Sequence, residues 1–241
     1  MAISLRELAR KMVDILELKT QPVAVKFRET AEGDHLEQRK MRYCQALMLA
    51  RHGKEVVLTA ENLACPAAAA AFGFKPLPEK IAEGNMLANL GLFAQPAAAK
   101  YTMSLMPRLE RGKYQAVHLL PLSQAEDVVP DVVVVEGLPE QLMWIILASV
   151  FNTGGRLNFE TGVFQATCVD ATVVPFMKQK VNASFSCYGC REASDIDLSE
   201  TVMGFPGGIL EEVVDALSRL AAKALPRARG KSVYKGFVGQ K

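Results

Sequence analysis

The sequence lacks the features that mark several large classes of protein. It has no long apolar run: Leu142 to Phe151 comes closest, with about ten residues, where a bilayer-spanning helix needs about twenty. It also lacks an excess of one charge, because 28 Lys and Arg stand against 26 Asp and Glu and the formal net charge is +2. We therefore expect no membrane partner and no nucleic-acid partner.

The sequence has little histidine and none of the common catalytic motifs. Its three histidines are scattered, and it has no His-Glu-x-x-His, no phosphate-cradling glycine loop and no Ser-His-Asp order. No reaction is indicated, so whether the protein is an enzyme stays open.

The N-terminal segment lacks the uninterrupted apolar core of a signal peptide. Residues Met1 to Leu18 instead predict an amphipathic helix, in which Ser4 and Glu7 form a capping-box pattern. We therefore expect a cytoplasmic protein. Thiols stay mostly reduced there, so the five cysteines are better interpreted as metal ligands, redox groups or buried apolar residues than as disulfides.

The order of helices and strands predicts a mixed α/β (α+β) fold. Half of the 241 residues are hydrophobic, which is enough for a core without disulfides. The valine run from Asp131 to Glu136 predicts a strand covered on both faces, and Gly208 to Ala224 predicts an amphipathic helix. Further strands are expected at residues 23–27, 55–59, 103–105, 116–120, 157–160, 181–187 and 202–205, and helices at 41–51, 66–71, 79–93 and 139–151.

The chain also predicts two structurally related halves packed as one unit, residues 1–125 and residues 126–241. Each half shows a helix, a glycine, a strand, a cysteine and a helix in that order, with Cys65 in the first half and Cys168 in the second. We take this as a hypothesis of internal duplication. A pseudo-twofold axis would then relate Cys65 to Cys168 and bring both to the interface between the halves.

The most informative chemistry lies in Cys187-Tyr188-Gly189-Cys190. Two residues between cysteines let both sulfurs point at one centre, and Gly189 permits the tight turn that exposes backbone N–H groups to them. This spacing is typical of a thiolate-bound zinc, an iron–sulfur cluster or a redox dithiol. The motif follows a predicted strand, so the sequence gives no sign of activation by a helix dipole.

The other three cysteines allow two interpretations each. Cys65 directly precedes Pro66 and an alanine-rich helix, which places its sulfur near a helix N-terminus; Cys168 is expected at an equivalent place. Both also fit small buried residues. For Cys44, on the apolar side of its helix, packing in the core is the favoured interpretation.

Taken together, the cysteines predict a metal centre held between the two halves. Four thiolates complete a tetrahedral zinc site or a [4Fe–4S] cluster, and ligands this scattered along the chain favour a cluster or metal held between the halves over a zinc ribbon. The expected ligands are Cys65, Cys168, Cys187 and Cys190, with Cys44 in reserve. Arg191, next to Cys190, would favour thiolates or bind an anionic ligand; an ordinary surface loop explains this residue equally well.

Several stretches resemble the domain of unknown function 169 family of bacteria and archaea, over nearly the whole chain. They are Leu5-Arg6-Glu7-Leu8 through Pro22-Val23-Ala24-Val25, Glu61-Asn62-Leu63-Ala64-Cys65-Pro66, Ala166-Thr167-Cys168, and Ser184-Phe185-Ser186-Cys187-Tyr188-Gly189-Cys190-Arg191. The resemblance implies an uncharacterised prokaryotic protein with no activity to carry over. It also implies variation at the position of Cys190, which makes Cys44, Cys65, Cys168 and Cys187 the alternative ligand set.

Our leading hypothesis is a cysteine-ligated metal or iron–sulfur protein with a redox or accessory role in metabolism and an unknown redox partner. The first alternative is a metal-free module that binds a small molecule between its halves. The second is a thiol–disulfide redox protein built on Cys187 and Cys190. The valine-rich and alanine-rich segments fit either a core or a subunit interface, so a homodimer stays open.

Overall fold

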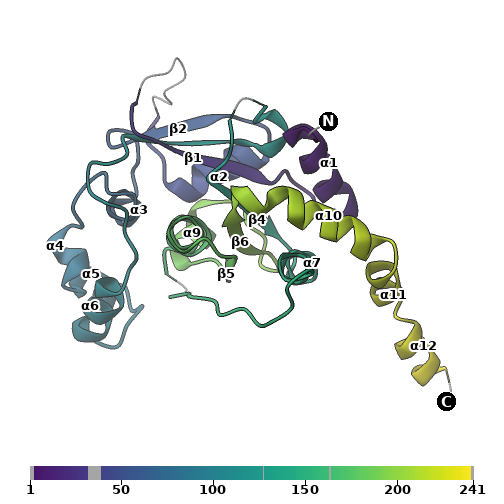
Figure 1. The fold of residues 1–241 in the computed structure, drawn as a ribbon. Helices are drawn as coiled ribbons and strands as arrows, with labels where there is room; N and C mark the ends of the chain where they lie inside the picture. The colour runs from purple at the N-terminus through teal and green to yellow at the C-terminus, as the bar shows by residue number, and fades with distance from the viewer. Residues whose placement is uncertain (1–2, 32–38, 127, 163, 240–241) are drawn as a thin grey trace.

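Six strands in the described part of the chain form one sheet at the centre of the molecule (Figure 1). The computed structural model describes residues 3–31, 39–126, 128–162 and 164–239. The strands are β1 (Val23–Arg28), β2 (Val56–Thr59), β3 (Ala116–Pro121), β4 (Val132–Gly137), β5 (Asn182–Ser184) and β6 (Thr201–Pro206). They lie in the order β2-β3-β1-β4-β6-β5, and every neighbouring pair is antiparallel.

Helices cover both faces of this sheet. They are α1 (Leu5–Leu16), α2 (Tyr43–Arg51), α3 (Pro66–Ala71), α4 (Glu79–Ala82), α5 (Asn85–Asn89), α6 (Pro96–Ser104), α7 (Pro139–Ser149), α8 (Val174–Lys178), α9 (Tyr188–Ala193), α10 (Leu210–Ala221), α11 (Ala224–Gly230) and α12 (Ser232–Val238), with the 3-10 helices η1 (Leu122–Gln124) and η3 (Gly207–Ile209) and the π-helix η2 (Ala166–Val173). None of the helices described is long and apolar enough to cross a membrane.

The alternation of side chains along the central strands separates two cores. On β4, Val132 and Val134 join the core beneath α2, α3 and η2, whereas Val133 and Val135 join the core beneath α1, α7 and α10. Successive strand residues point to opposite faces, so a strand that is apolar at every position must be covered on both. The prediction from the valine run is therefore confirmed, as is the mixed α/β class of the fold.

Three local predictions are wrong for identifiable reasons. Residues 103–105 do not form a strand, because helix α6 continues to Ser104. Residues 157–160 form no strand either: the side-chain amide of Asn182 accepts from the backbone N–H of Glu160 and donates to its carbonyl, at 2.7 and 2.8 Å, in place of a ladder. The helix expected at 79–93 is divided by Gly84, whose φ of +80° suits glycine.

The predicted alignment of the two halves is not seen. It paired α2 with α7 and the strand at 55–59 with one at 157–160. The second strand does not form, and α2 and α7 pack on opposite faces of the sheet. An equivalence of Cys65 and Cys168 therefore finds no support in the fold.

Two parts of the chain lie outside the two covered faces. Helices α4, α5 and α6 contact one another and form a small cluster at one side of the molecule (Figure 1). Helices α11 and α12 continue from α10 and lead away from the sheet (Figure 1). Only the cluster of α4, α5 and α6 bears on the site described next.

Candidate functional site

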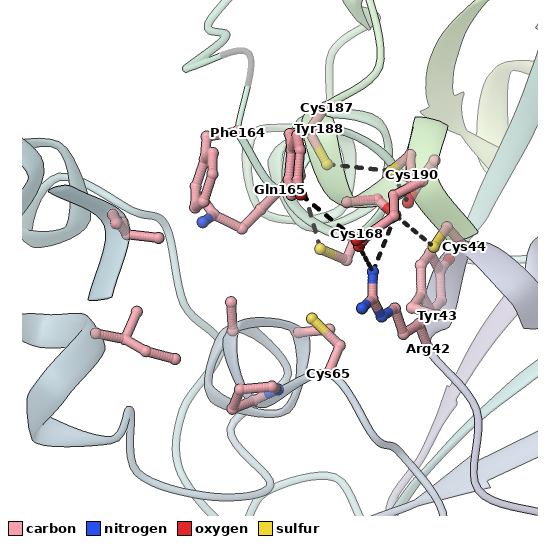
Figure 2. A pocket seen from close by; sticks show the side chains of 18 of the residues that line it. Arg42, Tyr43, Cys44, Cys65, Phe164, Gln165, Cys168, Cys187, Tyr188 and Cys190 are labelled. Carbon is pink, nitrogen blue, oxygen red and sulfur yellow. Dashed lines mark hydrogen bonds and ion pairs between the residues drawn. The ribbon is translucent and has the colours of Figure 1, made fainter. Parts of the chain in front are cut away.

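All five cysteines line one cavity of about 390 Å³ on the α2, α3 and η2 face of the sheet (Figure 2). Cys44 lies in α2, Cys65 precedes α3, Cys168 lies in η2, and Cys187 and Cys190 belong to the start of α9. Four segments that are far apart in the sequence thus contribute sulfur to one space. All five thiols are free.

Two of the cysteines occupy the same position relative to a helix. Cys65 is the N-cap of α3, as expected from Pro66 at the first helical position. Cys187 is the N-cap of α9, a helix start of which the sequence gave no sign. The six-residue helix escaped prediction because Ser186 adopts a left-handed conformation, with φ of 68°, which turns the chain directly from β5 into α9.

The Cys187 and Cys190 sulfurs are 3.2 Å apart and both are buried. Contact with Cys190 and burial raise the pKa of the Cys187 thiol, although backbone N–H groups of Ala166 and Cys190 that point at its sulfur favour the thiolate. For Cys190 the contact with Cys187 lowers the pKa, but contact with Cys44 and burial outweigh it and raise the pKa to about 11. In the absence of a metal ion, these shifts favour the neutral dithiol over the thiolate at pH 7.

Cys168 lies among the other thiols rather than at the rim of the cavity. Burial raises its pKa, and the charges of Cys65, Cys187 and Cys190 add to that effect. Its thiol donates to the carbonyl of Gln165 over 3.6 Å. Gln165 has a left-handed φ of 59° and begins the π-helix, a widened turn that is common at functional sites.

Cys44 also faces the cavity. Its thiol donates weakly to the carbonyl of Gly189, at 3.9 Å, inside the Cys-x-x-Cys turn. Cys44 is buried, as the core interpretation requires. However, it lies beside the Cys-x-x-Cys motif as well as beside apolar residues of the core. The sequence placed Cys44 on the apolar side of a helix but gave no sign of this neighbour.

The cation of the cavity is Arg42, which sequence reasoning missed. Its guanidinium donates to the carbonyl of Gly189 and pairs with Glu192 at 2.8 Å. Arg191, which was expected to bind a ligand, is not among the residues that line the cavity. It donates instead to the carbonyls of Phe185, Asp197 and Glu200, and so orders the loop between α9 and β6.

The wall opposite the thiols is apolar. Phe164, the residue before Gln165, forms part of it. The rest comes mostly from apolar residues in and around α4 and α5, which are Ile81, Met86, Leu87, Leu90 and Leu92. An apolar wall lowers the local dielectric and excludes water, which strengthens any bond between a thiolate and a cation. Within the described residues, no three His, Cys, Asp or Glu side chains form a group that could hold a metal ion.

Comparison with known proteins gives a relationship but no activity. The chain is 30% identical over 219 residues to an uncharacterized protein of Methanocaldococcus jannaschii, MJ0308, across 88% of this chain and 93% of that protein. No solved structure matches. The family model of domain of unknown function 169, described as "Uncharacterised ArCR", matches residues 11–216. The resemblance read from the cysteine motifs is thereby confirmed: the chain belongs to the domain of unknown function 169 family.

Proposed function

We propose that the protein binds an iron–sulfur cluster, or in its place a zinc ion, through the cysteines of this cavity. The observation that carries the proposal is the convergence of all five cysteines from four separate segments on one space. Thiols that serve only as small packing residues have no reason to share a cavity, because each fits wherever the core has room. Four thiolates are the usual ligands of a cubane cluster.

The size of the cavity favours a cluster over a single ion. A zinc ion holds its thiolates about 2.3 Å from its centre, so four of them lie within about 4 Å of one another. The five thiols here line one side of a cavity of about 390 Å³, so there is room beside them for more than a single ion. A cluster of several iron and sulfide ions fills more volume and takes ligands that are further apart. We therefore place the iron–sulfur cluster first and zinc second.

The protein would tune such a group through its surroundings. The backbone N–H groups that point at the Cys187 sulfur would stabilise negative charge on a cluster ligand. Arg42 at the rim would offset part of the remaining charge. The apolar wall would keep water away, and burial and N–H···S bonds are the main levers by which proteins set a cluster's reduction potential. These features support a redox or accessory role.

The test is the composition of protein purified without oxygen. We expect a broad visible absorption band with iron and acid-labile sulfide bound to the chain, or bound zinc if the alternative holds. The double variant Cys168→Ser with Cys187→Ser should lose the bound metal. Thr167→Val is the matched control, because Thr167 lines the same cavity and touches Cys190 at 3.3 Å without offering a thiol. Wild-type protein without iron or zinc, in which every thiol reacts freely, would contradict the proposal.

A second candidate function rests on the 3.2 Å contact between the Cys187 and Cys190 sulfurs. In metal-free protein, the small ionised fraction of one of the two thiols would attack a small disulfide, form a mixed disulfide and release one thiol. The other thiol would then attack the protein sulfur of that mixed disulfide and release the second thiol, so that two protein thiols are oxidised as one disulfide is reduced. Incubation with oxidised glutathione should then yield a Cys187–Cys190 disulfide by peptide mass mapping, whereas unreacted thiols would rule this activity out.

A further inference from the structure

The two halves of the sheet repeat one pattern of strands. Outward from the central pair of β1 and β4, the first half continues with β3 and β2, and the second half with β6 and β5. In both halves the strand that flanks the central pair, β3 or β6, is the third strand of its half in sequence order. The strand at the edge of the sheet, β2 or β5, is the second. All pairs are antiparallel, and a twofold axis perpendicular to the sheet relates antiparallel neighbours such as β1 and β4.

The registers of the strands agree with this relationship. Val23, the first residue of β1, faces Pro121, the last residue of β3. Val132, the first residue of β4, likewise faces Pro206, the last residue of β6. Each of these four strands has six residues. A shift by one residue in either half would break the correspondence.

The edge strands follow the same rule. Val56, the first residue of β2, faces Leu119, which lies two positions before the proline that ends β3. Asn182, the first residue of β5, faces Gly204, which lies two positions before the proline that ends β6. One correspondence of residues thus accounts for the pairing of all three strands in each half.

The connections after the inner strands also correspond. The 3-10 helix η1 follows Pro121, and η3 follows Pro206. The backbone N–H of Leu122 donates to the carbonyl of Pro22 at 2.8 Å, and that of Gly207 donates to the carbonyl of Asp131 at 2.9 Å. Pro22 and Asp131 each directly precede the first strand of their half. The two hydrogen bonds are therefore equivalent.

The elements that carry the cysteines obey the same correspondence. Helix α2 packs on β1, β2 and β3, and the π-helix η2 packs on β4, β5 and β6, both on the same face. Helix α3 follows β2 as α9 follows β5. The counterpart of α2 is therefore η2 rather than α7, and the counterpart of α3 is α9.

This correspondence sorts four of the five cysteines into pairs. Cys44 lies near the start of α2 and Cys168 near the start of η2. Cys65 is the N-cap of α3 and Cys187 the N-cap of α9. Cys190 has no counterpart, because the residue three positions after Cys65 is Ala68.

We infer that an internal pseudo-twofold axis runs between β1 and β4 and through the cavity, and that the cluster is held by Cys44 with Cys168 and Cys65 with Cys187. Cys190 is then a neighbour of the cluster and not a ligand. The inference rests on the proposed function, and it specifies which four thiols perform it. Two pairs related by an axis surround one centre, and a cubane cluster itself has twofold axes, so the symmetry of the protein matches that of the group.

The decisive experiment compares single serine variants of all five cysteines, each purified without oxygen. We expect Cys44→Ser, Cys65→Ser, Cys168→Ser and Cys187→Ser each to lower bound iron and visible absorbance about tenfold or more, since losing a ligand costs at least what losing an outer partner costs. Cys190→Ser should keep both near the wild-type level. Circular dichroism of each variant separates loss of the cluster from loss of the fold.

A second measurement needs no variant. Wild-type protein with its cluster bound should have one thiol per chain that is not bound to iron. Because Cys190 is buried, labelling with a small maleimide is continued until one thiol per chain has reacted, and peptide mapping should identify that thiol as Cys190. Iron retained by Cys44→Ser and lost by Cys190→Ser, or Cys44 found as the reactive thiol, would overturn the inference while the proposed function stands. Loss of iron in all five variants would overturn it too. Wild-type protein with no iron would instead overturn the proposed function.

Discussion

Arg51 and Glu136 are charged side chains that the fold buries between α2 and β4. Their nearest nitrogen and oxygen are 3.3 Å apart, and Arg51 also reaches Glu200 and Asp195, at 3.3 and 2.7 Å. Within the described residues neither carboxylate oxygen of Glu136 has a hydrogen-bond partner. Burial raises the pKa of Glu136 to about 7, against the opposing effect of Arg51. The group is thus poised to take up a proton near neutral pH.

Glu136 should therefore make stability depend on pH. Its pKa in the folded protein, about 7, exceeds its ordinary value of 4.5, so the folded state binds the proton more tightly between these values. The free energy of unfolding should consequently fall as the pH rises from 4.5 to 7, by up to about 1.4 kcal/mol per unit from this group, and level off above. Glu136→Gln removes this contribution. Urea unfolding of both proteins across this range measures the difference.

The wild type must be compared with Glu136→Gln because other groups also titrate between pH 4.5 and 7. Burial raises the pKa of Asp170 to about 6 and lowers that of His118, and both effects are common to wild type and variant. Glu126→Gln is a matched control, since Glu126 is exposed and pairs with Arg6 at the surface. Parallel curves for wild type and Glu136→Gln would show that Glu136 stays ionised throughout.

At the scale of elements, the position of η2 depends on one glycine in β6. A Cβ atom on Gly204 would lie 1.8 Å from the carbonyl oxygen of Ala171, so the π-helix touches the strand at a place where only glycine fits. We expect Gly204→Ala to push η2 off the sheet, to lower the free energy of unfolding by about 1–3 kcal/mol or more, and to reduce bound metal by displacing Cys168.

Gly208→Ala is the control for this substitution. Gly208 lies just after β6, and a Cβ atom there would meet nothing within 4 Å. Its unfolding midpoint and metal content should match those of the wild type. If Gly204→Ala retained wild-type stability and metal, the close approach of η2 to β6 would not position Cys168.

Elements with a strong local signal could be predicted from the sequence, and elements set by distant contacts could not. The valine run of β4 and the Ser4 cap of α1, where Ser4 accepts from the backbone of Glu7, are local and were predicted. The wide turns of η2 were not, because they depend on fit against β5 and β6. The missing strand at 157–160 depends on the side chain of Asn182, more than twenty residues away.

The site divides in the same way. The residue types and the Cys-x-x-Cys spacing indicated thiolate chemistry, and all the proposed ligands line the cavity. The sequence gave no means to choose Arg42 over Arg191, because both lie within two residues of a cysteine. Only the long-range contact of Arg42 with Gly189 and Glu192 distinguishes them.

At the scale of the whole molecule, neither half has a complete sheet or a complete site. The central pair of β1 and β4 joins residues 1–125 to residues 126–241, and both cores continue across it. Two of the four inferred ligands, Cys44 and Cys65, lie in the first half, and Cys168 and Cys187 lie in the second. Metal binding should therefore add to the stability of the contact between halves, because the bound ion or cluster links them.

This predicts how the chain behaves when it is cut after Ala125. Residues 1–125 and 126–241 produced together should copurify through a tag on one of them and should carry metal. Each fragment alone would expose the edge of β1 or β4 and the valines that the other half covers, so we expect it to aggregate and to bind no metal. Copurification followed by metal analysis checks both points.

A second fragment with Cys168→Ser and Cys187→Ser should still copurify but without metal, which separates pairing of the strands from metal binding. A single fragment that stays monomeric and holds metal would show that one half alone provides the site, against the convergence of sulfur from both.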